Sequence, residues 1–77
     1  MADPALLDKA FGLALRDARA TAGMSQEGLA EAASLHRTYI SQMERGLKSP
    51  SLRVMKALAD ALGITVVSLV GKAVGES

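Results

Sequence analysis

Apolar residues recur at spacings of three and four through the first 22 positions, a pattern typical of a helix with one face in a core. Pro4 suits the first turn of such a helix, and Asp3 is placed to cap it. Gly23 is placed to end it in the left-handed conformation. We therefore predict a helix from Pro4 or Ala5 to Ala22. Its inward stripe is Leu7, Phe11, Leu15, Ala18 and Ala22.

A second apolar line on the same predicted helix does not fall on this stripe. It consists of Leu6, Ala10 and Leu13. Two ways of covering it remain open, since either the C-terminal segment of the same chain or another subunit is suited to bury it.

Two shorter helices are predicted between positions 25 and 46. Ser25 is an N-cap for a helix over residues 26–33. A short turn leads to the next helix, residues 37–45, which Gly46 closes. The positions expected to face inward are Leu29, Ala30, Ala33, Ile40 and Met43.

The C-terminal part of the chain predicts two further helices. Ser51 is placed to cap a helix over residues 52–62, and Thr65 to cap a shorter one over residues 66–72. The run ITVVSLV, residues 64–70, also has the composition of a strand, but a lone strand has nothing to pair with here. The inward stripe of the fourth helix is Leu52, Met55, Leu58, Ala59 and Leu62.

These five helices predict an all-α fold, in a single domain that covers residues 1–77. Residues 25–45 form two short helices joined by a tight turn, which is a helix-turn-helix arrangement. The second of them is a rod of about 13 Å at ~1.5 Å per residue, and it fits a major groove about 12 Å wide.

Composition excludes several classes of protein. The chain has no cysteine and one histidine, so we expect neither disulfides nor a metal site. It offers no nucleophile–base pair and no phosphate-cradling glycine loop, so we expect neither an enzyme nor a cofactor. The N-terminus lacks the pattern of a signal peptide, and no run approaches the roughly 20 apolar residues of a membrane span. We expect a soluble cytoplasmic protein.

The charges are unevenly distributed along the chain. Residues 36–56 hold five basic residues and one acidic residue, a net charge of +4. Residues 1–35 carry three basic and five acidic residues, a net charge of −2, and residues 57–77 carry a net charge of −1. A basic block of this kind indicates a polyanionic partner, although a solvated surface accounts for the same pattern.

The third predicted helix carries the densest set of side chains suited to contact such a partner. Its apolar edge is formed by Ile40 and Met43, and Glu44 is its only acid. Its other edge carries Arg37, Thr38, Ser41, Gln42 and Arg45.

Four segments of the chain resemble the phage-repressor and Cro-like (XRE) helix-turn-helix family of transcriptional regulators. They are GMSQEGLAEAA (23–33), TYISQMERG (38–46), PSL (50–52) and LADALGI (58–64). The resemblance covers roughly residues 11 to 70 and implies a lambda-repressor-like five-helix domain that binds double-stranded DNA as a homodimer. Within the family, the small size and the RTYIS run resemble the controller proteins of restriction–modification systems.

The resemblance implies how the exposed edge of the third helix meets DNA. Arg37 is suited to donate two hydrogen bonds to guanine, and Gln42 to pair bidentately with adenine. Thr38 is suited to place its methyl group against thymine, and Ser41 is the weakest candidate of the four. Phosphate contacts are expected from Ser25, Gln26, Tyr39, Arg45, Lys48 and Ser49. Ser25 also serves as a cap, and the ring of Tyr39 has a second option in packing against a neighbouring helix.

The resemblance also implies an ion pair between Arg19 and Glu44, which explains the lone acid in a basic helix. His36 is expected to be a surface residue or a neighbour of phosphate, and not a metal ligand. Ser34 stands where the family commonly has glycine, so a left-handed backbone there adds strain of about 1 kcal/mol.

The segment from residue 64 to 72 is unusually apolar for the end of a small chain. We expect it to form an isologous dimer interface, with completion of the core of a single chain as the alternative. The residues concerned are Ile64, Val66, Val67, Leu69 and Val70.

The sequence therefore predicts a dimeric, sequence-specific transcriptional regulator that binds a near-palindromic operator. RNA polymerase is a further candidate partner, through Glu27 and Glu31, and no small-molecule ligand is expected. The alternative is an antitoxin-like protein-interaction module of a toxin–antitoxin pair, although the chain has few residues left for a toxin-binding segment.

Overall fold

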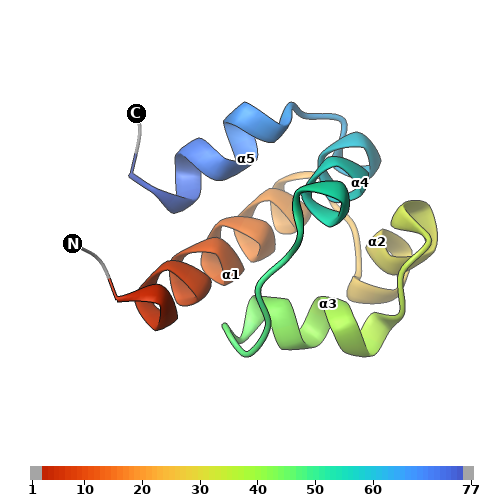
Figure 1. The fold of residues 1–77 in the computed structure, drawn as a ribbon. Coiled ribbons are helices and arrows are strands. Elements are labelled where there is room, and N and C mark those ends of the chain that lie inside the picture. Colours follow the sequence, from red (N-terminus) through yellow and green to blue (C-terminus); the bar gives the residue numbers. More distant parts are fainter. Residues whose placement is uncertain (1–2, 76–77) are drawn as a thin grey trace.

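The computed structural model describes residues 3–75, and over this range all regular structure is helical. Figure 1 shows α1 running through the middle of the molecule, with α5 and α4 on one side of it and α3 on the other. The prediction of a five-helix, all-α fold is confirmed. The helices are α1 (Pro4–Thr21), α2 (Gln26–Ala33), α3 (Arg37–Glu44), α4 (Leu52–Leu62) and α5 (Val66–Ala73).

Capping side chains begin four of these helices, at the positions that the sequence predicts. The caps are Asp3, Ser25, Ser51 and Thr65, and each side chain accepts a hydrogen bond of 2.9–3.1 Å from a backbone amide of the first turn. The exception is α3, where the side chain of His36 makes no capping hydrogen bond. The first amides of α3 are therefore left without a side-chain acceptor from this cap.

All five helices contribute side chains to one hydrophobic core. The largest fully buried side chains are Leu15, Leu29, Ile40, Met43, Leu58 and Leu69. Because α1 packs against both α3 and α5, it joins the two sides of the domain. The predicted inward stripes are confirmed in the middle of each helix, where neighbouring helices surround it.

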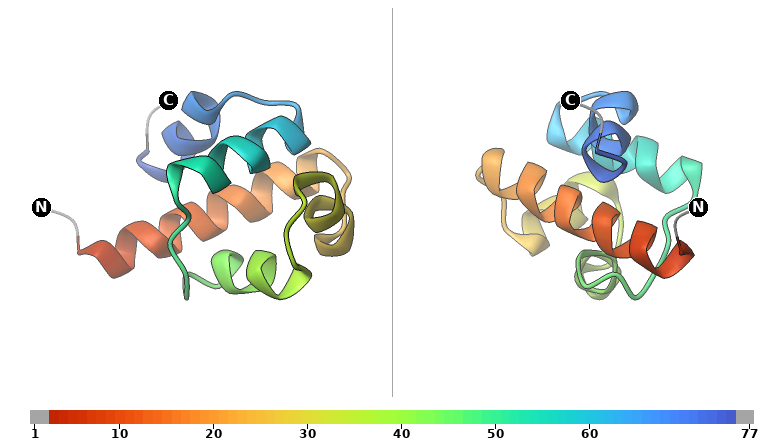
Figure 2. Two further views of the ribbon diagram at one scale, coloured as in Figure 1. Left: turned by 45° about the vertical axis from the view of Figure 1, so that its right-hand side comes forward. Right: turned by 90° about the vertical axis from the view of Figure 1, so that its left-hand side faces the viewer.

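Three residues expected on inward stripes are exposed instead. Leu7 and Ala22 lie on the surface of α1 and at its C-cap, and Leu52, the first residue of α4, is 70% exposed. Each lies near a helix end. Figure 2 shows the N-terminal part of α1 extending beyond the other helices. Helical periodicity alone does not indicate where the neighbouring helices stop.

The second apolar line on α1 is not covered by the C-terminal segment. Leu6 and Leu13 are exposed, and Ala10 is half-buried. The residues of α1 that are buried against the other helices are Phe11, Gly12, Ala14, Leu15 and Ala18. Of the two proposed covers, the C-terminal segment of the same chain is therefore excluded.

The C-terminal helix divides the residues expected at a dimer interface. Leu69 is 0% exposed and belongs to the core of the single chain, so its assignment to the interface is wrong. Ile64 packs partly against this core, and Val66 and Val70 are half-buried. Val67 is 82% exposed. The amphipathic character of α5 thus serves the core on one face and leaves valine side chains on the other.

The turn between α2 and α3 contains the left-handed residue that was expected at Ser34, where the family commonly has glycine. Ser34 has φ 57° and ψ 43°, which is left-handed, and it is the C-cap of α2. The amide of Leu35 donates to the carbonyl of Ala30 at 2.8 Å and closes the turn. The left-handed backbone expected at Ser34 is therefore confirmed, and a non-glycine residue in this conformation costs about 1 kcal/mol.

Over residues 3–75, no group of three or more His, Asp or Glu side chains could hold a metal ion. No single helix there has the length and hydropathy needed to cross a bilayer. The pair α4 and α5 passes that test only together, and it is bent by 107°.

Candidate nucleic-acid interface

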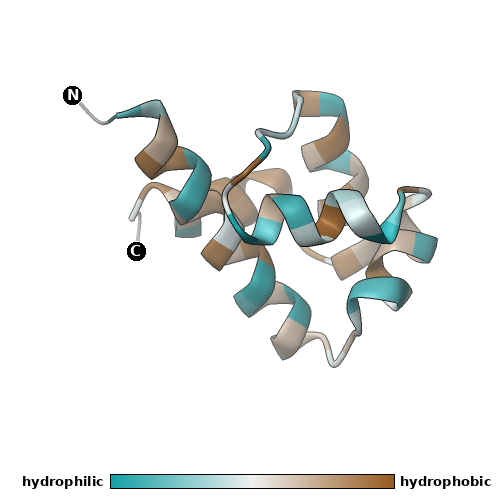
Figure 3. Ribbon diagram, turned by 90° about the horizontal axis from the view of Figure 1, so that it is seen from below, coloured by the Kyte–Doolittle hydropathy of each residue, from teal (hydrophilic) through white to brown (hydrophobic). Residues whose placement is uncertain are grey.

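The third helix has one buried edge and one accessible edge. Ile40 and Met43 are both 0% exposed and fix α3 against the core. Arg37 and Thr38 are exposed at its start, and Ser41 and Gln42 are half-exposed one turn later. Figure 3 views the molecule from the side of α3 and shows mostly hydrophilic or neutral colours along this helix. The four residues predicted to contact bases therefore share one accessible edge.

The close approach of α1 fixes the C-terminal end of α3. A Cβ atom added at Gly12 would lie 2.4 Å from the carbonyl oxygen of Met43 and 2.7 Å from that of Glu44. These contacts are with backbone atoms, so only a residue without a side chain fits between the two helices. Gly12 was not among the residues predicted to matter, although a glycine inside a helical stripe is a signal of close packing.

An ion pair links α1 to α3 between the two residues for which the family resemblance implies one. The Nε of Arg19 donates to Oε2 of Glu44 at 2.6 Å, and its Nη2 donates to Oε1 at 3.0 Å. The Nη1 of Arg19 also donates to the carbonyl oxygen of Met24 at 2.8 Å. The side chains are 17% and 5% exposed, respectively, so the pair is largely shielded from water.

The pKa of Arg19 reflects this environment. Its hydrogen bond with Glu44 raises the pKa above the ordinary value, burial lowers it, and the charge of Glu44 raises it further. The net change is upward. A group whose pKa is higher in the folded chain stabilises the fold at every pH below its ordinary pKa, so deprotonation of Arg19 does not weaken the pair near neutral pH.

Gln26 takes part in the same network, which sequence reasoning did not foresee. Its Nε2 donates to Oε1 of Glu44 at 3.1 Å, so Glu44 ties the start of α2 to the end of α3. Gln26 is half-buried, and its amide nitrogen has a second hydrogen that this bond does not use. The hydroxyl oxygen of the neighbouring Ser25 accepts a hydrogen bond from the backbone amide of Gly28 at 2.9 Å and caps α2.

The other residues predicted to meet phosphate lie on or just after α3. Arg45, Lys48 and Ser49 are exposed. Tyr39 is half-buried and its side chain packs against the core, which is the second of the two options open for it. The hydroxyl of Ser49 donates to the carboxylate of Asp8 on α1. That contact joins residues 41 positions apart, and no local pattern in the sequence indicates it.

This combination of fold and exposed edge defines a helix-turn-helix DNA-binding domain. A model of the Helix-turn-helix family matches residues 15–69, and the chain belongs to this family.

Two curated relatives match the central part of the chain. Control protein C.BamHI of Bacillus amyloliquefaciens is 46% identical over 55 residues, which is 70% of this chain and 68% of that protein. The immunity repressor protein of Bacillus phage phi105 is 45% identical over 49 residues, 64% of this chain. The chain spans only 34% of that repressor.

A solved structure extends the similarity over nearly the whole fold. The clp gene regulator ClgR of Corynebacterium glutamicum superposes with a TM-score of 0.85 at 37% identity, and the match covers 91% of this chain and 90% of that one. The expectation of a helix-turn-helix transcriptional regulator is confirmed at the level of the family and the fold.

Proposed function

We propose that this chain regulates transcription by binding a near-palindromic operator as a homodimer. The observation that carries the proposal is the two-sided character of α3, where Ile40 and Met43 are fully buried and Arg37 and Thr38 are exposed. A helix held this firmly presents its outer edge in a fixed orientation, which base recognition in the major groove requires. Arg37 and Gln42 carry most of the proposed sequence preference.

Replacing Arg37 by alanine should weaken operator binding about tenfold, roughly 1.4 kcal/mol, because a bidentate contact to guanine would be lost. Binding to random DNA should change much less. Fluorescence anisotropy with an operator selected from random sequences, and with a scrambled duplex of equal length, measures both affinities.

Two lysine variants serve as controls. Lys48→Ala should weaken binding to cognate and to random DNA equally, because a phosphate contact carries no sequence information. Lys72→Ala removes the same charge from α5, on the other side of the domain (Figure 1), and should change little. Equal losses of selectivity from Arg37→Ala and Lys48→Ala would contradict the proposed division between base and phosphate contacts.

The proposed dimer uses the exposed valines of α5 and its C-cap. Val67 is 82% exposed and Val74 is 54% exposed, and Val70 and Val74 line an open hollow beside α1 and α4. A second copy of this surface would remove these valines from water. A two-fold dimer presents two α3 helices ~34 Å apart, one turn of DNA.

Val67→Glu should convert the dimer into monomers, because two carboxylates would then be buried at the two-fold contact. Sedimentation equilibrium at micromolar concentration measures the change. Leu13→Glu is a matched control, since Leu13 is 64% exposed on α1. If Leu13→Glu dissociates the dimer and Val67→Glu does not, the interface lies on the second apolar line of α1.

The regulatory input that we propose is the concentration of the protein itself. DNA binding coupled to dimerisation gives a steep response to concentration.

RNA polymerase is a further proposed partner, through Glu27 and Glu31, which are both exposed on α2. A regulator of this kind acts where the bacterial or phage DNA lies, so we place it in the cytoplasm. Similarity to C.BamHI supports control of restriction–modification genes as the specific role.

A further inference from the structure

Three contacts along α1 hold the end of α3 and the segment that follows it. Gly12 faces the carbonyl oxygens of Met43 and Glu44. One turn earlier, a Cβ on Gly46 would lie 2.7 Å from Cγ and 3.0 Å from Cα of Lys9. Next to Lys9, the carboxylate of Asp8 accepts a hydrogen bond from the hydroxyl of Ser49. The order of the contacts is antiparallel, so α1 aligns this whole stretch of chain.

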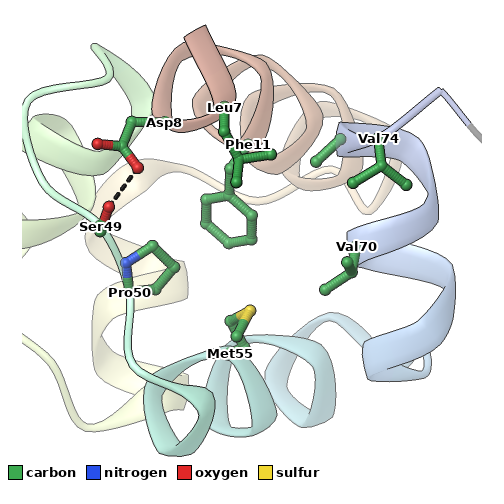
Figure 4. Close-up of a pocket in the computed structure, with 9 residues that line it drawn as sticks. Leu7, Asp8, Phe11, Ser49, Pro50, Met55, Val70 and Val74 are labelled. Atoms are coloured by element: carbon green, nitrogen blue, oxygen red, sulfur yellow. Dashed lines mark hydrogen bonds between the residues drawn. The ribbon is translucent and has the colours of Figure 1, made fainter. Parts of the chain in front are cut away.

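The last of these contacts borders an open hollow of about 220 Å³. Figure 4 shows Ser49 and Pro50 on one side of the hollow, with Phe11 and Met55 flanking it and Val70 of α5 and its C-cap Val74 across it. Ser49 is exposed beside this hollow, so packing does little to fix the position of its side chain. The hydrogen bond to Asp8, seen as a dashed line in Figure 4, provides the fixed point.

The carboxylate of Asp8 has two opposing effects at a DNA-binding surface. It repels phosphate, since its negative charge lies beside the segment that carries Lys48. It also occupies the hydroxyl of Ser49, so the groups left to meet phosphate there are the ammonium of Lys48 and the backbone amides. The orientation of those groups depends on where the segment is held.

We propose that Asp8 is a positioning residue for DNA binding, which holds residues 45–50 in place for phosphate contact through the hydroxyl of Ser49. The inference rests on the proposed function, because it assigns Asp8 a part in DNA binding without direct contact. Its effect should be independent of sequence, since phosphate contacts position the protein and base contacts select the site.

The test compares Asp8→Ala, Asp8→Asn, Ser49→Ala and the double variant Asp8→Ala/Ser49→Ala. Affinities for the selected operator and for a scrambled duplex are measured at several salt concentrations, and the thermal midpoint of each variant is recorded. Asp8→Ala and Ser49→Ala should each lower the affinity for both duplexes about three- to tenfold. The double variant should be no weaker than the single ones, because both changes remove one interaction.

Two readouts separate positioning from a general loss of stability. The slope of log affinity against log salt should fall by about one in Asp8→Ala and Ser49→Ala, which corresponds to one lost phosphate contact. Asp8→Asn keeps an acceptor for the hydroxyl and removes the repulsive charge, so it should bind at least as tightly as the wild type. The thermal midpoints should remain close to that of the wild type, because the contact is exposed.

Tighter binding by Asp8→Ala, with no change in Ser49→Ala, would overturn the inference and leave Asp8 as a repulsive charge only. Unchanged salt slopes in both variants would also overturn it. These outcomes leave the proposed function intact as long as Arg37→Ala loses operator selectivity. If the wild-type protein fails to bind the duplexes even at low salt, the proposed function itself fails, and the inference with it.

Discussion

Replacing Glu44 by alanine should lower the free energy of unfolding by about 3–5 kcal/mol, the range for breaking one side of a buried ion pair. The guanidinium of Arg19 would lose both bonds to the carboxylate, at 2.6 and 3.0 Å, while remaining largely shielded from water. Gln26 would lose its acceptor as well. A domain of 77 residues has roughly 4–12 kcal/mol of stability in all, so this variant should lose at least about a quarter of it.

Urea unfolding followed by circular dichroism measures this loss, and a constant slope with denaturant shows that the unfolding transition remains comparable. Glu44→Gln is the matched control, because it keeps one acceptor oxygen for Arg19 and replaces the other by an uncharged amide group. It should cost less than Glu44→Ala. A loss below 1 kcal/mol in Glu44→Ala would show that the pair is as weak as an exposed one.

Gly12→Ala should destabilise the fold by about 3 kcal/mol, at the upper end of the roughly 1–3 kcal/mol range for overpacking. The added methyl group would overlap the carbonyl oxygens of Met43 and Glu44, at 2.4 and 2.7 Å. Backbone cannot move aside as a flexible side chain can, so α1 and α3 must separate. Operator affinity should fall in the fraction that stays folded, because α3 would shift relative to the rest of the domain.

Gly28→Ala is a control with the same chemical change in another helix. A Cβ at Gly28 would meet only Oγ of Ser25, at 3.2 Å, and alanine favours a helix by up to ~1 kcal/mol over glycine. We therefore expect Gly28→Ala to be neutral or stabilising. Thermal unfolding of the two variants compares them directly. A similar midpoint for Gly12→Ala and Gly28→Ala would contradict close backbone packing between α1 and α3.

Local chemistry in the sequence determined the helices and their boundaries. The serine, threonine and aspartate caps lie within a few residues of the backbone amides from which they accept hydrogen bonds. The start of each of these helices can therefore be predicted without knowing the fold. Apolar spacing likewise identified the buried middle of each helix, such as Leu15 and Leu58. The arrangement of α2 and α3, and the polar edge of α3, follow from these same patterns.

Residues near helix ends were less predictable for a clear reason. Leu7 and Leu52 continue the apolar spacing of their helices, yet they lie where neighbouring helices no longer cover them. Leu69 shows the opposite case, because its fully buried position depends on how α5 packs onto the rest of the domain. Spacing indicates which residues share a face, whereas burial depends on what stands opposite that face.

The sequence by itself determined five helices, a helix-turn-helix and a basic outer edge on α3, since caps and periodicity act over one or two turns. Only the tertiary structure decided three contacts. Gln26 donates a hydrogen bond to the Glu44 carboxylate of the Arg19–Glu44 pair, Gly12 lets the backbone of α3 approach α1 closely, and Asp8 accepts a hydrogen bond from Ser49. These contacts link residues far apart in the chain. Their partners are chosen by the packing of whole helices, and no local pattern records that choice.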